Sequence, residues 1–168
     1  MKKDKPFQSL NIAVLTVSDT RDETNNTAGD LLEGALKESG HQLSEKMIVK
    51  DNIYHIRSIV SVWIASTDVQ VVLVSGGTGF NAKNSTIEAL TPLFDKTVDG
   101  FGELFRQLSF DDIGTSTLQS RAVAGLANGT VIFSMPGSTG ACQLAWEKII
   151  QSQLDARHGP CNFVPHLK

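Results

Sequence analysis

The sequence predicts an α/β fold: a single-domain three-layer α/β/α arrangement with a mostly parallel central sheet. Near-continuous apolar runs at residues 11–17, 71–74 and 130–135 are typical of strands that are buried on both faces, as in parallel sheets covered by helices. Each run is followed by a polar or glycine-rich turn and then by apolar residues at helical spacing. Strands that alternate with helices in this way predict parallel β-α-β connections.

The length of the chain predicts one domain. It has 168 residues, of which 40% are hydrophobic. Domains usually hold about 100 to 200 residues, so we expect a single domain across residues 1–168. Its core is expected at about residues 8–155. Residues 156–168 contain two prolines and two histidines without periodicity, and we expect them to form a tail that packs along a neighbouring surface or subunit.

Composition and charge exclude several classes of protein. The formal net charge of −3, from 15 basic and 18 acidic residues, gives no electrostatic basis for binding nucleic acid or an anionic membrane. Cys142 and Cys161 have neither zinc-ligand spacing nor a disulfide pattern, so we expect reduced thiols. Residues 1–6 are polar, unlike a signal peptide, and no run of about 18 apolar residues occurs. These features predict a soluble, cytoplasmic protein.

The first half of the chain is expected to hold two strand-loop-helix units. Residues 11–17 form the first strand, and a polar loop begins at Ser18. The helix after this loop lines one face with apolar residues, namely Ala28, Leu31, Leu32, Ala35 and Leu36. Gly40 is expected to end that helix, and residues 43–49 alternate in polarity like an edge strand. Asp51 then opens a second helix, either as its N-cap, which the pattern favours, or as a functional carboxylate.

The middle of the chain predicts further helices after the run at residues 71–74. Ser85 and Glu88 have the spacing of a capping box, so a helix is expected to begin near Ser85. An amphipathic helix is expected from about Phe101, where Glu103 is either a functional carboxylate or a solvated charge.

The last third of the chain predicts one more strand between two helices. Residues 121–125 predict a short helix with Arg121 as a candidate anion ligand. After the strand at residues 130–135, Ser138 or Thr139 is expected to cap a helix that continues to about residue 154.

Polar loops follow three of the predicted strands, at residues 18–21, 75–79 and 136–139. The carboxyl ends of parallel strands meet at one edge of a sheet, so we expect these loops to converge on one crevice. Backbone amides of glycine-rich turns and hydroxyl groups suit phosphate. A site that holds phosphates and carboxylates together usually needs Mg²⁺ to offset their repulsion.

Other site types lack their motifs or their side chains. Residues 77–84 imitate a Walker A loop, but Ala82 and Asn84 flank Lys83 where that motif needs Gly and Ser or Thr. No Ser-His-Asp spacing, nucleophile elbow or His-Glu-x-x-His motif is present. The loop at residues 18–21 also has the position of a flavodoxin-type phosphate loop for flavin mononucleotide. However, one Tyr and two Trp provide few planar side chains to flank a flavin.

Five short motifs fall in order across nearly the whole chain. They are Thr-Val-Ser-Asp-Thr-Arg at residues 16–21, Ser-Gly-Gly-Thr-Gly at 75–79, Asp-Gly-Phe-Gly-Glu at 99–103, the segment at 115–121, and Met-Pro-Gly-Ser at 135–138. Together they resemble the molybdenum cofactor biosynthesis protein B and Mog family (MoaB/Mog). The resemblance implies a molybdopterin-binding domain that assembles as homotrimers or homohexamers, with other proteins of the pathway as further partners. It also implies a reaction, in which the terminal phosphate of molybdopterin attacks the α-phosphate of Mg-ATP and pyrophosphate leaves.

The resemblance further implies roles for individual residues. Asp51 and the position of Asn84 match two catalytic carboxylates, and Asp51 would also bind Mg²⁺. The residues implied to bind substrate or cofactor are Ser18, Asp19, Ser75, Gly76, Gly77, Thr78, Gly79, Glu103, Ser120, Pro136, Gly137 and Ser138. Because the amide of Asn84 has no charge to hold Mg²⁺, two hypotheses stay open. One is a molybdopterin adenylyltransferase that uses Mg²⁺ and ATP, and the other is a catalytically weak carrier or scaffold that binds molybdopterin or a precursor.

Overall fold

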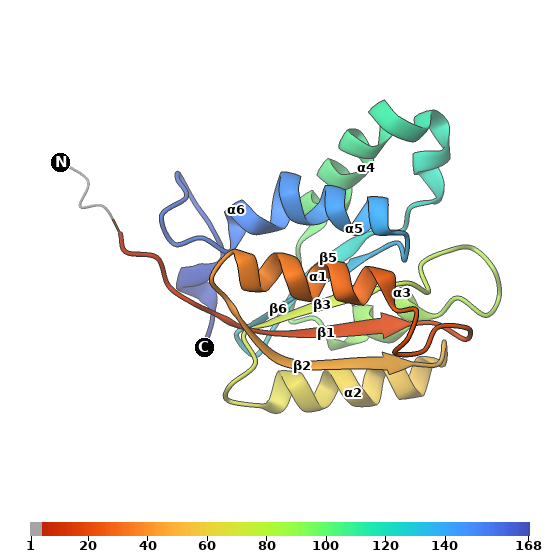
Figure 1. Cartoon of the computed structure of the whole chain (residues 1–168), viewed down its shortest axis with the longest axis horizontal. Coiled ribbons are helices and arrows are strands. Elements are labelled where there is room, and N and C mark those ends of the chain that lie inside the picture. The colour runs from red at the N-terminus through yellow and green to blue at the C-terminus, as the bar shows by residue number, and fades with distance from the viewer. Residues whose placement is uncertain (1–4) are drawn as a thin grey trace.

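The computed structural model describes residues 5–168, which form one six-stranded sheet with helices on both faces (Figure 1). The predicted polar start at residues 1–6 lies largely outside this range. The strands are β1 (Asn11–Val17), β2 (Gln42–Val49), β3 (Val71–Ser75), β4 (Lys96–Thr97), β5 (Val123–Ala127) and β6 (Thr130–Met135). The helices are α1 (Thr27–Glu38), α2 (Ile53–Ala65), α3 (Thr86–Leu90), α4 (Asp99–Ile113), α5 (Thr139–Ala145) and α6 (Gln151–Gln153), with a π-helical turn (Trp146–Ile150) between the last two.

The strand order β2-β1-β3-β6-β5-β4 is parallel across its first four strands and antiparallel across the last two pairs. In the parallel part, Val14 lies opposite Leu73, which in turn lies opposite Phe133. The predicted mostly parallel sheet is therefore confirmed, and β2 lies at the edge as its alternating polarity predicted. The four parallel strands end at the same edge, which we call the carboxyl edge.

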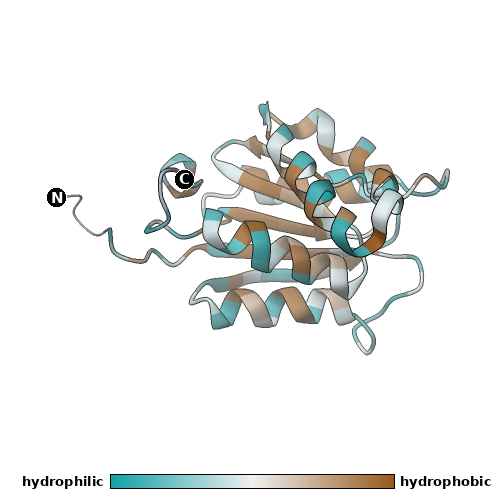
Figure 2. Cartoon of the chain, turned by 90° about the horizontal axis from the view of Figure 1, so that it is seen from above, coloured by the Kyte–Doolittle hydropathy of each residue, from teal (hydrophilic) through white to brown (hydrophobic). Residues whose placement is uncertain are grey.

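Apolar side chains on the two faces of the sheet form two cores. Val71 and Leu73 pack with α1, α4 and α5 on one face, whereas Val72 and Val74 pack with α2 and α3 on the other. All four side chains are completely buried, as expected of a strand covered on both faces. Figure 2 shows the apolar strands beneath helices whose outer surfaces are more polar. The three-layer α/β/α prediction is thus confirmed.

The predicted short helix at residues 121–125 is wrong, because Val123–Ala127 is the strand β5. It pairs antiparallel with β6 through a hairpin whose turn residues, Asn128 and Gly129, have φ angles of 48° and 71°. Positive φ at both central residues is the geometry of a type I′ turn, for which Asn-Gly is a strong sequence signal. The short antiparallel strand β4 was also absent from the sequence prediction.

The carboxyl-terminal part follows its prediction closely. Ser138 caps α5 by accepting a hydrogen bond at Oγ from the Ala141 amide at 3.1 Å. The tail packs against its own chain, where the Lys168 amide donates to the Gly129 carbonyl at 3.0 Å and Gln70 Nε2 donates to the Lys168 carbonyl at 2.7 Å. Within residues 5–168, no helix is both long and apolar enough to span a membrane.

Candidate functional site

The carboxyl-edge site consists of the loops at residues 18–21, 75–79 and 136–138 together with Asp51 and Asn84. The three loops follow β1, β3 and β6, Asp51 follows β2, and Asn84 lies in the turn before α3. They gather where the parallel strands end, on the right of Figure 1. Two of the loops touch through their backbones, because a Cβ atom on Gly137 would lie 3.1 Å from Gly76 Cα. The structure therefore brings together the three loops that the sequence predicted to converge.

Glycines are required in the turn after β3 because the backbone there is tightly packed. Gly76 has a φ angle of 92°, and a Cβ atom on it would lie 2.2 Å from the Val17 carbonyl oxygen. Gly77 has a φ angle of 66°, and its Cβ atom would lie 2.1 Å from Thr86 Oγ1. Thr86 fixes the turn further by donating from Oγ1 to the Gly76 carbonyl at 2.8 Å. These contacts hold the turn in a conformation that a residue with a side chain could not adopt here, and a fixed backbone suits amides that bind an anion.

Arg121 holds the other half of this turn in place. Its Nε donates to the Thr78 carbonyl at 2.9 Å, and its Nη2 donates to the Gly79 carbonyl at 2.6 Å. Its Nη1 pairs with Glu88, and the hydrogen bond from Arg121 lowers the pKa of the Glu88 carboxyl. Since Glu88 pairs with Arg121 and Ser85 makes no side-chain cap, the predicted capping box is wrong, although α3 does begin next to Ser85. Arg121, predicted as an anion ligand, is instead engaged in shaping the turn.

Asp51 is not the N-cap of α2, as the residue pattern had favoured. That position belongs to Asn52, whose Oδ1 accepts from the amides of Tyr54 and His55 at 3.0 Å each. The carboxylate of Asp51 instead reaches across to the segment before α3. Its Oδ1 accepts from the amide of Ser85 at 2.9 Å and from the Ser85 hydroxyl at 2.7 Å.

The second oxygen of Asp51 accepts a hydrogen bond from Asn84 Nδ2 at 3.1 Å. An ionised carboxylate only accepts hydrogen bonds, so the NH₂ group of Asn84 must be the group that faces it. The same oxygen lies 3.0 Å from where a Cβ atom on Gly77 would be, so a side chain at residue 77 would crowd it. Both oxygens of Asp51 are therefore engaged by donors of the protein.

This donor set is a poor match for Mg²⁺, because it supplies one carboxylate where the resemblance implies two. Mg²⁺ is usually held by one or two carboxylates with substrate phosphates and water completing an octahedron. Here the two Asp51 oxygens accept three hydrogen bonds, and Asn84 turns an N–H donor toward Asp51 where a second carboxylate would supply a charged ligand. Across residues 5–168, no cluster of three or more His, Cys, Asp or Glu side chains could hold a metal ion.

The loop after β1 is linked to Asp51 through its backbone. Asp19 Oδ1 accepts from the Asp51 amide at 3.0 Å, and Lys50 Nζ donates to the Asp19 carbonyl at 2.7 Å. Ser18 Oγ accepts from the amides of Thr20 and Arg21 at 3.2 and 3.0 Å, which closes the loop on itself. The side chain of Ser18 therefore serves the loop conformation.

The remaining predicted residues occupy different positions. Ser75 is completely buried under the glycine turn, and the Pro136 carbonyl accepts a hydrogen bond from the buried Cys142 thiol. Ser120 lies just before Arg121, and its carbonyl accepts from Arg106 Nη1 at 3.3 Å. Glu103 is exposed on α4, and none of the hydrogen bonds within residues 5–168 links its side chain to the three loops. The structure thus does not join Glu103 to the carboxyl-edge site.

A cavity of about 580 Å³ lies beside Asp51 and Asn84, and no residue of the three loops lines it. Its wall includes Asp51, Asn84 and Arg121, and also Phe80 and Lys83, which the sequence had not marked as site residues. The available signal was an aromatic and a cationic side chain within an otherwise small, polar loop. This volume is in the range of cavities that hold small ligands, about 300 to 1,000 Å³.

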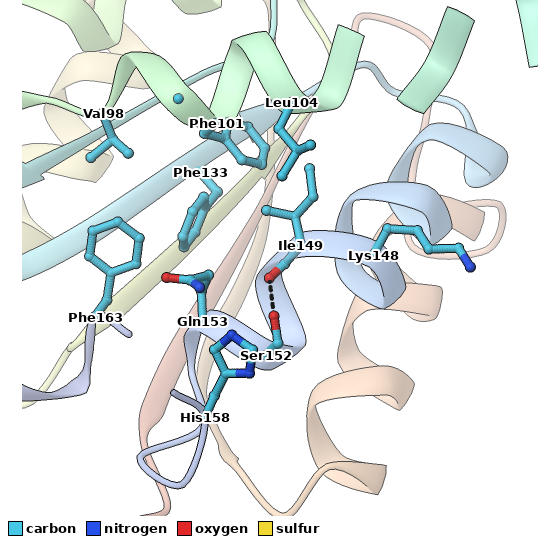
Figure 3. Close-up of a pocket in the computed structure, with 11 residues that line it drawn as sticks. Val98, Phe101, Leu104, Phe133, Lys148, Ile149, Ser152, Gln153, His158 and Phe163 are labelled. Atoms are coloured by element: carbon cyan, nitrogen blue, oxygen red, sulfur yellow. Dashed lines mark hydrogen bonds between the residues drawn. The ribbon is translucent and has the colours of Figure 1, made fainter. Parts of the chain in front are cut away.

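A second cavity, of about 430 Å³, lies between the start of α4, the π-helical turn and the tail. Its walls are mainly apolar, with Phe101, Phe133 and Phe163 around it (Figure 3). The amine of Lys148 points away from this space in Figure 3, so it provides no anion-binding group there. None of the predicted site residues lines this cavity.

Comparison with known proteins agrees with the fold and the loops. A family model described as "Probable molybdopterin binding domain" matches residues 13–156. Molybdenum cofactor biosynthesis protein B of Escherichia coli strain K12 is 61% identical over 162 residues, which are 96% of this chain and 95% of that protein. The chain belongs to the molybdenum cofactor biosynthesis protein B family. The match to the family model includes all three loops, Asp51 and Asn84.

Solved structures of the protein B family share the same architecture. A crystal structure of a Molybdenum cofactor biosynthesis protein B superimposes with a TM-score of 0.86 at 44% identity, covering 89% of this chain and 94% of the other. The tungsten cofactor synthesizing protein MoaB from Pyrococcus furiosus superimposes with a TM-score of 0.79 at 32% identity, covering 88% and 93%. The resemblance inferred from the sequence motifs is thereby confirmed.

Proposed function

We propose that this chain is a cytoplasmic protein of molybdenum cofactor biosynthesis that binds molybdopterin or a precursor at the carboxyl-edge site without Mg²⁺, as a carrier or scaffold of weak catalytic activity. The family model and the name of the Escherichia coli relative support the pathway and the ligand. The observation that carries the choice between binding and catalysis is the hydrogen bond from Asn84 to Asp51. The amide of Asn84 thus stands at the position where catalysis with Mg²⁺ would need a second carboxylate.

The glycine turn supplies the chemistry for binding. The backbone of Gly76 and Gly77 is fixed by packing, and Arg121 fixes the carbonyls of Thr78 and Gly79. The amide of Gly76 donates to the Met135 carbonyl at 3.0 Å, whereas no hydrogen bond within residues 5–168 engages the amides of Gly77, Thr78 and Gly79. Fixed amides can bind the phosphate of molybdopterin without a reorganisation cost at the moment of binding.

A second candidate function is that of a molybdopterin adenylyltransferase, with Mg²⁺ and ATP as cofactors. The retained carboxylate of Asp51 favours it, as does the cavity of about 580 Å³ that this residue lines. Such a reaction depends mainly on positioning and on neutralising phosphate charge. The amide of Asn84 opposes it, because it lacks the negative charge with which a second carboxylate would hold Mg²⁺.

Flavin mononucleotide receives no support as the ligand. The two tryptophans, Trp63 and Trp146, are each 3% exposed and belong to the two cores. They are therefore not available to flank a flavin ring at the carboxyl edge.

Binding and turnover can be separated in one set of measurements. Calorimetry with molybdopterin in the presence of a chelator should detect binding by the wild type, and incubation with molybdopterin and Mg-ATP should release little pyrophosphate. Asn84→Asp should gain pyrophosphate release that depends on Mg²⁺. Rapid release by the wild type would instead establish the transferase, and an absence of molybdopterin binding would reject both functions.

Self-association is part of the same proposal, as a trimer or a hexamer, with other proteins of the pathway as further partners. Exposed apolar side chains gather on α4 and the turn that follows it, where Phe110, Ile113 and Leu118 are 53%, 49% and 75% exposed. Such a group of side chains is typical of an interaction surface. Analytical ultracentrifugation of the wild type would give the stoichiometry, and a monomer would reject this part of the proposal.

A further inference from the structure

Phe80 is unusual in its position, because it is a large aromatic side chain that is 68% exposed in the loop directly after the glycine turn. It belongs to neither of the two cores. Folding therefore gains little from the ring, whereas leaving an aromatic surface in water has a cost. An exposed aromatic residue on the wall of a cavity instead indicates a contact with a ligand.

The ring of Phe80 is held by Arg121. The guanidinium carbon lies 5.1 Å from the ring centroid, within the range of a cation–π contact. Arg121 is itself immobilised by the Thr78 carbonyl, the Gly79 carbonyl and Glu88. One side of the ring is therefore backed by a fixed, planar group, and most of the rest of its surface is open.

The ring also lies beside groups that can bind the rest of a ligand. Phe80 shares the cavity of about 580 Å³ with Asn84 and Lys83. Asn84 donates to Asp51 with its Nδ2, while its Oδ1 accepts no hydrogen bond from residues 5–168 and lies on the side of Gly79. A ligand ring placed against Phe80 would thus meet a hydrogen-bond acceptor at its edge, and an anionic group of the same ligand would share the cavity with the amine of Lys83.

We infer that Phe80 is a stacking platform for the bicyclic heteroaromatic ring of the ligand, a purine or a pterin, and that Arg121 is the positioning residue that holds the platform. The inference rests on the proposed function for the pterin, whereas the purine arm does not depend on it. Stacking on an aromatic side chain contributes about 1–3 kcal/mol per ring, which corresponds to a change of roughly 5- to 150-fold in the dissociation constant.

The test is calorimetry with three probes, namely adenosine 5′-monophosphate, molybdopterin and ribose 5-phosphate, which has no heteroaromatic ring. Phe80→Ala should weaken binding of the first probe, the second or both by at least roughly fivefold and should leave ribose 5-phosphate unchanged. Phe80→Tyr keeps the ring and should bind like the wild type. Tyr54→Ala is the matched control, because Tyr54 is 71% exposed and also contacts an arginine, Arg57, but does not line the cavity.

The probes distinguish the possible outcomes. Loss for adenosine 5′-monophosphate alone identifies a purine platform, and loss for molybdopterin alone identifies a pterin platform. Equal binding of every ring-bearing probe by Phe80→Ala and the wild type overturns the inference while leaving molybdopterin binding intact. If the wild type does not bind molybdopterin, the proposed function fails, but adenosine 5′-monophosphate still tests the role of Phe80. If the wild type binds adenosine 5′-monophosphate no more tightly than ribose 5-phosphate, the inference about Phe80 is overturned.

Discussion

Replacing Asn84 by aspartate turns the amide–carboxylate contact with Asp51 into a contact between two carboxylates. In the wild type, Asn84 Nδ2 donates to Asp51 Oδ2 at 3.1 Å. Asn84→Asp removes this donor and adds a negative charge at nearly the same place. We expect the variant to be less stable than the wild type when no divalent cation is present, and to regain stability when Mg²⁺ is added.

The size of the effect follows from the geometry. Two unit charges about 4 Å apart repel by about 1 kcal/mol in water and by about 4 kcal/mol at the effective dielectric constant near a protein surface. Asp51 is half-buried, so we expect a loss of about 2–3 kcal/mol, including the lost hydrogen bond. A cation at a concentration about 100 times its dissociation constant would restore about 2.7 kcal/mol. In a domain of this size, such a loss lowers the melting temperature by roughly 5–10 °C.

The assay is thermal unfolding of the variant at neutral pH, with a chelator and then with increasing Mg²⁺. Asn81→Asp is the matched control, because it adds the same charge to the same loop, at an exposed residue that makes no contact with Asp51. A large, Mg²⁺-reversible shift in Asn84→Asp and a small one in Asn81→Asp are expected. Equal melting temperatures for Asn84→Asp with and without Mg²⁺ would refute the view that two carboxylates at this place need a cation between them and that the amide of Asn84 removes this need.

Three further predictions concern glycine packing, thiol burial and the arginine. Gly76→Ala should lose about 2–4 kcal/mol in urea unfolding, because of its positive φ and the backbone oxygen 2.2 Å from the new Cβ, whereas Gly100→Ala, with open space, should change by less than about 1 kcal/mol. Burial raises the pKa of the Cys142 thiol to about 12. Since an unfolded thiol ionises at about pH 8.5, the free energy of unfolding should fall by up to about 1.4 kcal/mol per pH unit above that value. The fall should be smaller in Cys142→Ala. In the native state, mass spectrometry should find only the exposed Cys161 alkylated. Arg121→Lys, which keeps the charge but loses the two-carbonyl contact, should weaken molybdopterin binding roughly tenfold in calorimetry, and unchanged binding would contradict its role in the turn.

The fold was largely predictable because its central strands are buried on both faces. Burial on both faces requires continuous apolar runs, and β1, β3 and β6 were recognised from them. β5 was not recognised, because Val-Ala-Gly-Leu-Ala is short, contains glycine and has no alternation. Its glycine, Gly125, is needed because a Cβ atom there would lie 2.2 Å from the ring of Phe94. That contact comes from a segment distant in the sequence, so no local pattern indicates it, whereas the Asn-Gly turn after β5 was a local signal that the sequence prediction did not use.

The site was predictable to the level of its loops, but not to the level of its hydrogen bonds. Both Asp51 and Asn52 are good N-cap residues, and the sequence alone does not distinguish them. In the structure Asn52 provides the cap, which leaves the carboxylate of Asp51 free to bind Ser85 and Asn84. If Asp51 only capped a helix, its carboxylate would be unaffected by the residue at position 84. Because Asp51 spans the gap between β2 and α3, a single change from amide to carboxylate at Asn84 alters both the charge of the cavity and the bond that closes it.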